Sequence, residues 1–118
     1  MPDLSSQILP KILQHKIEGL PLGNDFILPH YDGLSLVNIP GTITKLLEAP
    51  EFGKHPLDEA IIDPLNGPYE KVVLLLVDAM DINLFQKMMS QEEDLFWGHH
   101  SHKAIYSPIT SICPSTTA

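Results

Sequence analysis

The strongest structural signal in this sequence is the run Lys71-Val72-Val73-Leu74-Leu75-Leu76-Val77, which ends at Asp78. The run is apolar from its second residue onward and does not alternate with polar residues. This pattern is typical of a strand that is buried on both faces of a parallel sheet. The run therefore predicts an α/β fold rather than an all-helical one.

The sequence after Asp78 continues this α/β pattern. Ile82, Phe85 and Met89 follow at helical spacing and predict a helix over 81–89. Residues 104–112 predict a second strand that is bent at Pro108. A strand, a helix, a strand and the start of a further helix form the first βαβ part of an α/β sheet.

The sequence before the run is rich in proline and predicts only short helices. We expect one helix within 5–20 that begins near Pro10, because proline is favoured in the first turn. A second short helix should follow Asn38 as its cap, and a helical turn is expected at 57–62.

These elements predict two regions. Residues 1–70 form a leader with short helices and wrapping loops, and 71–118 form the start of a catalytic α/β domain that is truncated at 118. We therefore expect the chain to be an N-terminal piece of a larger enzyme.

Composition excludes several classes of partner. The net charge of −8 argues against binding to nucleic-acid polymers or to anionic membranes. The longest apolar run has six residues, whereas about 20 are needed to cross a bilayer. With a single cysteine and no signal-peptide pattern, we expect a cytoplasmic location.

Two positions carry residues suited to phosphate chemistry. Asp78 follows a predicted strand, where it could bind a cation or simply cap the next helix. The stretch Pro114-Ser115-Thr116-Thr117 stands where a helix should begin, and free N–H groups there suit a phosphate oxyanion. A hydroxyl held there beside a metal could become a nucleophile, or it could serve only as a cap.

Taken together, these two stretches resemble the alkaline phosphatase superfamily. The closest branch is the type I phosphodiesterase / nucleotide pyrophosphatase group, whose members share an apolar strand ending in Asp and a segment like Thr110-Ser111-Ile112-Cys113-Pro114-Ser115-Thr116-Thr117-Ala118. The stretch Tyr31-Asp32-Gly33-Leu34-Ser35-Leu36-Val37-Asn38-Ile39-Pro40 is similar to a leader in bacterial members. The resemblance covers roughly 30–118. It departs from the family where Ala79-Met80-Asp81 replaces the usual glycine.

The resemblance implies an alkaline-phosphatase-like sandwich with two divalent metal ions, zinc being the expected metal. Asp78 matches the first metal ligand, and Thr117 matches the nucleophile that also contacts metal. The implied reaction is hydrolysis of small phosphate esters, either phosphodiesters or nucleotide pyrophosphates, through a threonine phospho-enzyme. The other Asp and His ligands of the family would lie beyond 118, so we expect the chain to be inactive alone.

Other interpretations stay open. The parent could be a phosphomonoesterase or a sulfatase-like member of the same superfamily, although Cys113 lacks the surrounding sulfatase pattern. The chain could also be a non-catalytic fragment or interaction module whose exposed sheet edge needs a partner. His99, His100 and His102 are interpreted as a polar loop. Nothing in the sequence indicates an oligomeric state.

Overall fold

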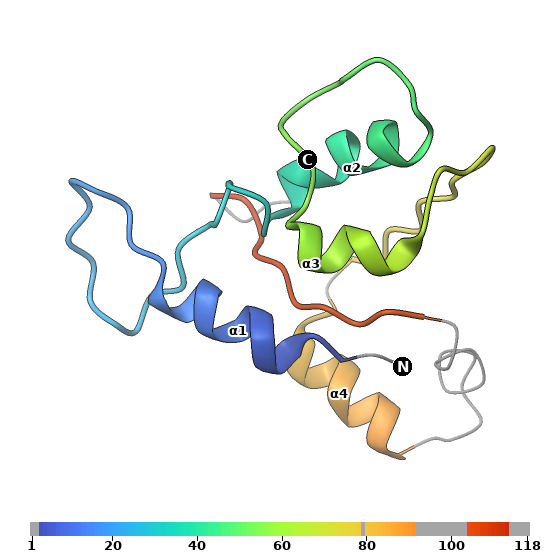
Figure 1. Ribbon diagram of the computed structural model, residues 1–118. Coiled ribbons are helices and arrows are strands. Elements are labelled where there is room, and N and C mark those ends of the chain that lie inside the picture. The colour runs from blue at the N-terminus through green and yellow to red at the C-terminus, as the bar shows by residue number, and fades with distance from the viewer. Residues whose placement is uncertain (1–2, 79, 92–103, 114–118) are drawn as a thin grey trace.

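The computed structural model describes residues 3–78, 80–91 and 104–113 (Figure 1). Within them the chain forms helices and extended connections around a small core. The helices, in chain order, are α1 (Ser5–Gln14), the 3₁₀ turn η1 (Leu36–Asn38), α2 (Ile39–Leu46), α3 (Glu59–Ile62), the 3₁₀ turn η2 (Asp63–Leu65) and α4 (Ile82–Gln91).

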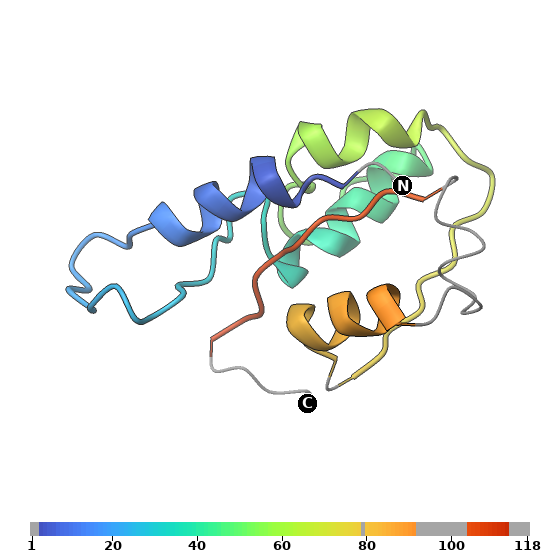
Figure 2. The ribbon, with the colours of Figure 1, turned by 90° about the horizontal axis from the view of Figure 1, so that it is seen from below.

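The core joins the leader to a segment from the other end of the chain. Its buried members are Ile8 and Ile12 from α1, Leu34 from the turn before α2, and Ile61 from α3. Ile8 and Ile12 are four residues apart and therefore lie on the same face of α1. Partly buried Ile109 packs against this cluster. In both views the extended segment 104–113, drawn in red, runs through the middle of the molecule beside α1 (Figures 1 and 2).

Helix α1 begins earlier than the sequence predicts. It starts at Ser5, and Pro10 lies inside it rather than in its first turn. Asp3 makes the early start favourable, because its Oδ1 accepts the Ser5 N–H at 2.8 Å. The hydrogen bond that Pro10 removes would have reached the carbonyl of Ser6. Both residues are exposed, so water can satisfy that carbonyl.

The two other predicted leader helices are present. Helix α2 directly follows Asn38, as expected, although the Asn38 side chain makes no cap hydrogen bond to it. Helix α3 lies within the predicted turn at 57–62. Asp58 caps it by accepting the Ala60 N–H at 3.0 Å.

The run 71–77 differs from the sequence prediction. The structure assigns it neither a strand nor a bridge. Residues 73–77 are exposed and Val72 is half-buried, so the run is not buried on both faces. Val73 is 92% exposed and Leu75 is 69% exposed. A strand exists only with a hydrogen-bonded neighbour, and the described residues place none beside this run. The α/β sandwich as a whole stays a prediction.

The second predicted strand is extended but pairs with the leader. Residues 104–113 form two isolated parallel bridges, Asp3 with Tyr106 and Ser35 with Thr110. The division into 1–70 and 71–118 also stays a prediction. The two bridges join a segment of 71–118 to residues of 1–70. Among the described residues, no helix is long and apolar enough to span a bilayer.

Candidate functional site

A broad groove of about 1450 Å³ contains the described part of the predicted site. It brings together four regions of the sequence: α1, the stretch between α1 and α2, the end of the run 71–77 with the start of α4, and the segment 106–113. Most of the lining is apolar. The lining residues that bear on the predicted chemistry are Asp78, Asp81, Tyr106, Thr110, Ser111 and Cys113.

Asp78 lies in the turn between the apolar run and α4, and its side chain is exposed in the groove. The cap hydrogen bond of α4 comes from Asp81, whose Oδ1 accepts the Leu84 N–H at 2.8 Å. The Asp81 carbonyl accepts the Phe85 N–H at 3.0 Å. Asp81 thus takes the capping role that the sequence left open for Asp78, and the cation-binding role of Asp78 stays a prediction.

Thr117 lies outside the described residues, as do Ser115 and Thr116. Its distance from Asp78 is therefore not defined. The structure describes the segment that leads to it as far as Cys113, which is exposed. The Cys113 N–H donates to the hydroxyl of Tyr31 at 3.1 Å.

Thr110 anchors this approach segment to the leader. Its backbone N–H donates to the carbonyl of Leu34 at 2.7 Å, and its own carbonyl accepts the Leu36 N–H at 3.0 Å. Its hydroxyl donates to the same Leu34 carbonyl at 2.9 Å and accepts the His30 N–H at 2.9 Å. Thr110 is only 6% exposed. Four hydrogen bonds in a dry environment fix the segment's register.

The side of the groove next to α4 is held by aromatic contact. The rings of Phe85 and Tyr106 are stacked, with centroids 5.2 Å apart and planes at 12°. Burial raises the pKa of Tyr106, and the negative charge of Asp3 adds to this effect. Tyr106 therefore stays protonated and neutral near pH 7, so it packs against α4 as an aromatic ring rather than as an anion.

The residues of 3–78, 80–91 and 104–113 include no cluster of three or more His, Cys, Asp or Glu side chains that could hold a metal ion. His99, His100 and His102 lie outside these ranges. Asp78 is thus the single predicted metal ligand whose surroundings are described. Two metal ions need more protein ligands than one carboxylate and one hydroxyl.

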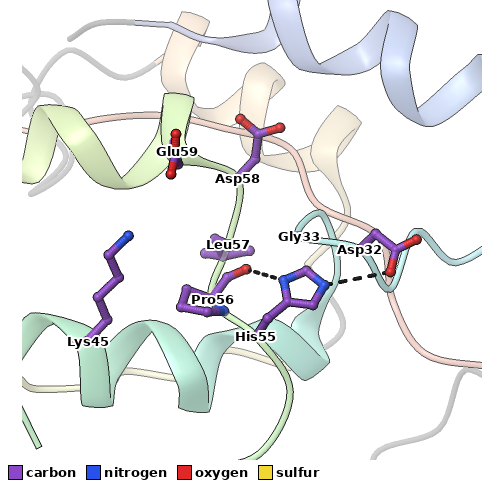
Figure 3. A pocket seen from close by; sticks show the side chains of 8 residues that line it. All are labelled: Asp32, Gly33, Lys45, His55, Pro56, Leu57, Asp58 and Glu59. Atoms are coloured by element: carbon purple, nitrogen blue, oxygen red, sulfur yellow. Dashed lines mark hydrogen bonds and ion pairs between the residues drawn. The ribbon is translucent and has the colours of Figure 1, made fainter. Parts of the chain in front are cut away.

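A second, smaller pocket of about 330 Å³ lies between α2 and α3, away from Asp78 (Figure 3). There His55 lies between two acceptors, with its Nδ1 3.0 Å from the Pro56 carbonyl and its Nε2 3.6 Å from Asp32 Oδ1. Asp58 at the opposite edge pairs with Lys11 Nζ at 2.8 Å. The hydrogen bond from that lysine is the main reason why the pKa of Asp58 is lowered. Asp32, His55 and Asp58 thus have local structural partners.

Comparisons with known proteins found no matching family model, curated protein or solved structure.

Proposed function

We propose that the protein in which this chain acts is a metal-dependent hydrolase of phosphodiesters or nucleotide pyrophosphates. The proposal rests on the resemblance of the two motifs, the run that ends at Asp78 and the segment that contains Thr117. One structural observation supports it above the others. The turn that carries Asp78 and the segment 106–113 line the same groove, although they are about 30 residues apart in sequence.

The donor chemistry of Asp78 suits one ligand of a divalent metal site. Its carboxylate is exposed in the groove, and the capping of α4 is assigned to Asp81. Carboxylate oxygens bind zinc and magnesium alike. The proposal therefore assigns Asp78 to one of two divalent ions, zinc being the expected metal, and requires further ligands besides Asp78 and Thr117.

The chemistry assigned to the chain's own residues is a nucleophilic displacement. The Thr117 hydroxyl gives its proton to solvent and its oxygen attacks phosphorus. The bond from phosphorus to the alcohol or phosphate leaving group breaks, that group departs and takes up a proton, and a threonine phosphodiester that keeps the other ester group of the substrate is formed. Water then hydrolyses that ester and restores the hydroxyl. When bound, the metal ions neutralise charge on the phosphoryl oxygens and favour the deprotonated nucleophile.

The charge of the chain limits the substrate that we propose. With a net charge of −8, a small phosphate ester held by metal ions is favoured over a nucleic-acid polymer or an anionic membrane surface. A cytoplasmic location belongs to the same proposal.

The test uses a longer protein that contains this chain. In it, Thr117→Ala should abolish the phospho-enzyme, while Thr117→Ser should retain part of it because a hydroxyl remains. Thr116→Ala is the matched control and should cost only a cap, about 0.5–2 kcal/mol of stability. Asp78→Asn should lower metal affinity and activity together. Mass spectrometry of the trapped intermediate decides: label on a residue other than Thr117 refutes the nucleophile, and full activity of Asp78→Asn refutes the metal role.

An interaction module is the second candidate function, and the exposed run 71–77 favours it. Val73, Leu75 and Leu76 each expose more than 65% of their surface, and contiguous apolar surface of this kind marks a binding face. If the longer protein shows no metal-dependent hydrolysis while this run binds a partner, the second function replaces the first.

A further inference from the structure

The exposed run 71–77 has charges of opposite sign at its two ends. Lys71 opens the run, Asp78 follows it, and every residue between them is valine or leucine. Residues 73–77 are each between 48% and 92% exposed. The backbone of 71–77 makes no hydrogen bond to another described residue, and Lys71 makes no ion pair with one. Within the described part of the chain, the run therefore presents an unpaired edge, an apolar surface and an unpaired cation.

A second copy of the run complements the first when the two lie antiparallel. If a two-fold axis passes between Leu74 and Leu75, Lys71 of each copy lies opposite Asp78 of the other. Valine and leucine then face valine and leucine at all positions between the charged pairs.

Other arrangements of the two runs are less favourable. Parallel strands in register would place Lys71 against Lys71 and Asp78 against Asp78. An antiparallel register shifted by two residues would place Lys71 against Leu76. Opposite charges that face each other across a strand pair stabilise it, whereas like charges destabilise it. The charges therefore favour the antiparallel register that is centred between Leu74 and Leu75.

The broad groove provides the apolar surface that a pair of strands needs in addition. A pair of strands alone is marginally stable in water, and packing against further apolar surface stabilises it. Leu76, Val77 and Asp78 line the groove together with the exposed Phe26 and Ile27. In the antiparallel register, residues 71–73 of the second copy lie beside 76–78 and therefore at the edge of the groove. Their valines can cover part of its apolar lining.

We propose that 71–78 is a homodimer interface, in which two copies of this chain pair antiparallel with contacts between Lys71 and Asp78 at both ends. The occupant is a second copy because the run is complementary to itself in charge and in length. Asp78 can accept the lysine together with contacts inside its own chain, because a carboxylate offers about four lone-pair positions. The inference gives a definite partner to the interaction module, the second candidate function, and does not rest on the hydrolase.

Sedimentation velocity of the 118-residue chain over a range of concentrations measures the association. Salt at about 0.15 M screens the net charge, and no metal is added, because a divalent ion on Asp78 would compete with the lysine. Lys71→Glu and Asp78→Lys each create like charges at both ends of the interface. Each should lower the association constant about tenfold or more.

The matched controls for these two variants are Lys54→Glu and Asp25→Lys, at exposed positions outside the run. They make the same changes in net charge, from −8 to −10 and from −8 to −6. Their association constants should stay within about twofold of wild type. Circular dichroism checks that all variants keep their helices.

Charge reversal separates the proposed register from a general effect of either substitution. The double variant Lys71→Glu with Asp78→Lys restores opposite charges in both pairs, so its association should return to within about threefold of wild type. A mixture of the two single variants should form a heterodimer, because an acid then faces a lysine at both ends. Native mass spectrometry with one variant isotopically labelled distinguishes this heterodimer from homodimers.

Three results would each overturn the inference. The first is a wild-type chain that stays monomeric over the whole concentration range. The second is a Lys71→Glu variant that associates as strongly as Lys54→Glu. The third is a double variant and a mixture that both fail to restore association. None of these results bears on the hydrolase, which is tested by the label on Thr117, and absence of that label leaves the association results as they are.

Discussion

Replacing Val73 and Leu75 with lysine tests whether the run 71–77 is an exposed association surface in this chain. In the structure the two residues are 92% and 69% exposed. Lysines at these positions should therefore leave the fold of the chain intact. They should weaken self-association of the 118-residue chain, because they remove apolar surface and place charge on an unpaired edge.

The size of the effect follows from the exposed fractions. Burying a valine or leucine side chain completely is worth about 1.5–3 kcal/mol. At the exposures of Val73 and Leu75, their burial in an associated state contributes about 2–5 kcal/mol per copy. Since 1.4 kcal/mol corresponds to a factor of ten in an equilibrium constant, the association constant should fall by at least about tenfold.

Sedimentation velocity over a range of protein concentrations measures the association, and circular dichroism checks the helices. The matched control places lysine at Asn83 and Gln86, two exposed polar positions on α4. Both double variants change the net charge from −8 to −6. An effect of charge alone would appear equally in both.

Two results would refute this reasoning. If the variant with lysines at Val73 and Leu75 associates as strongly as wild type, the run is not the surface through which copies meet. If that variant unfolds while wild type and the control stay folded, the run is buried, as the two-faced strand of the sequence prediction requires.

The remaining predictions concern the leader and the chain as a whole. Asn38→Ala should lower the free energy of unfolding by about 2–4 kcal/mol, because it leaves buried backbone groups unpaired; exposed Asn24→Ala, the control in denaturant titrations, should change it by less than about 0.5 kcal/mol. Because the pKa of Asp58 is lowered from 3.8, its ionised carboxylate contributes to the free energy of unfolding fully above that pH, and the contribution is lost as the pH falls through the folded-state pKa. Lys11→Met should flatten this loss when the free energy of unfolding is measured from pH 6 to 2. An unchanged dependence on pH would contradict the assignment. The isolated chain should show no zinc-dependent turnover of a nitrophenyl phosphodiester, since the resemblance supplies only Asp78 and Thr117, fewer protein ligands than two metal ions need. Saturable turnover that survives repurification would disprove this.

The helices were predictable from the sequence because their causes are local. The spacing of Ile82, Phe85 and Met89 predicted α4, whereas the possible cap that the sequence offered was Asp78 and the structure caps the helix with Asp81. The predicted start of α1 near Pro10 is several residues too late. It followed from the preference of proline for a first turn, whereas in the structure the Asp3 carboxylate accepts the Ser5 N–H and the helix starts there. At an exposed position the proline costs less than the rule for helix interiors suggests.

The run 71–77 could not be predicted in the same way. Its apolar residues favour a buried strand only if other strands pair with its edges and other elements cover its faces. Whether such partners are present depends on the rest of the chain and not on the run itself. The contact between Tyr31 and Cys113 joins residues 82 positions apart, and no periodicity or motif links them. A tyrosine in a turn and a backbone N–H after a bent strand are both common in proteins, so neither Tyr31 nor Cys113 indicates this contact in the sequence.

These two features together suggest what the leader contributes to the proposed enzyme. The leader already supplies partners for 104–113, through the packing of Ile109 on α1 and the bonds of Thr110, while it leaves 71–77 uncovered. Within this chain, therefore, the segment that approaches Thr117 has its own anchor and does not depend on a completed sheet. If the leader acts in this way, Asn38→Ala should loosen the anchor of 104–113 as well as lower the stability of the fold, because Asn38 holds the turn that carries Ser35.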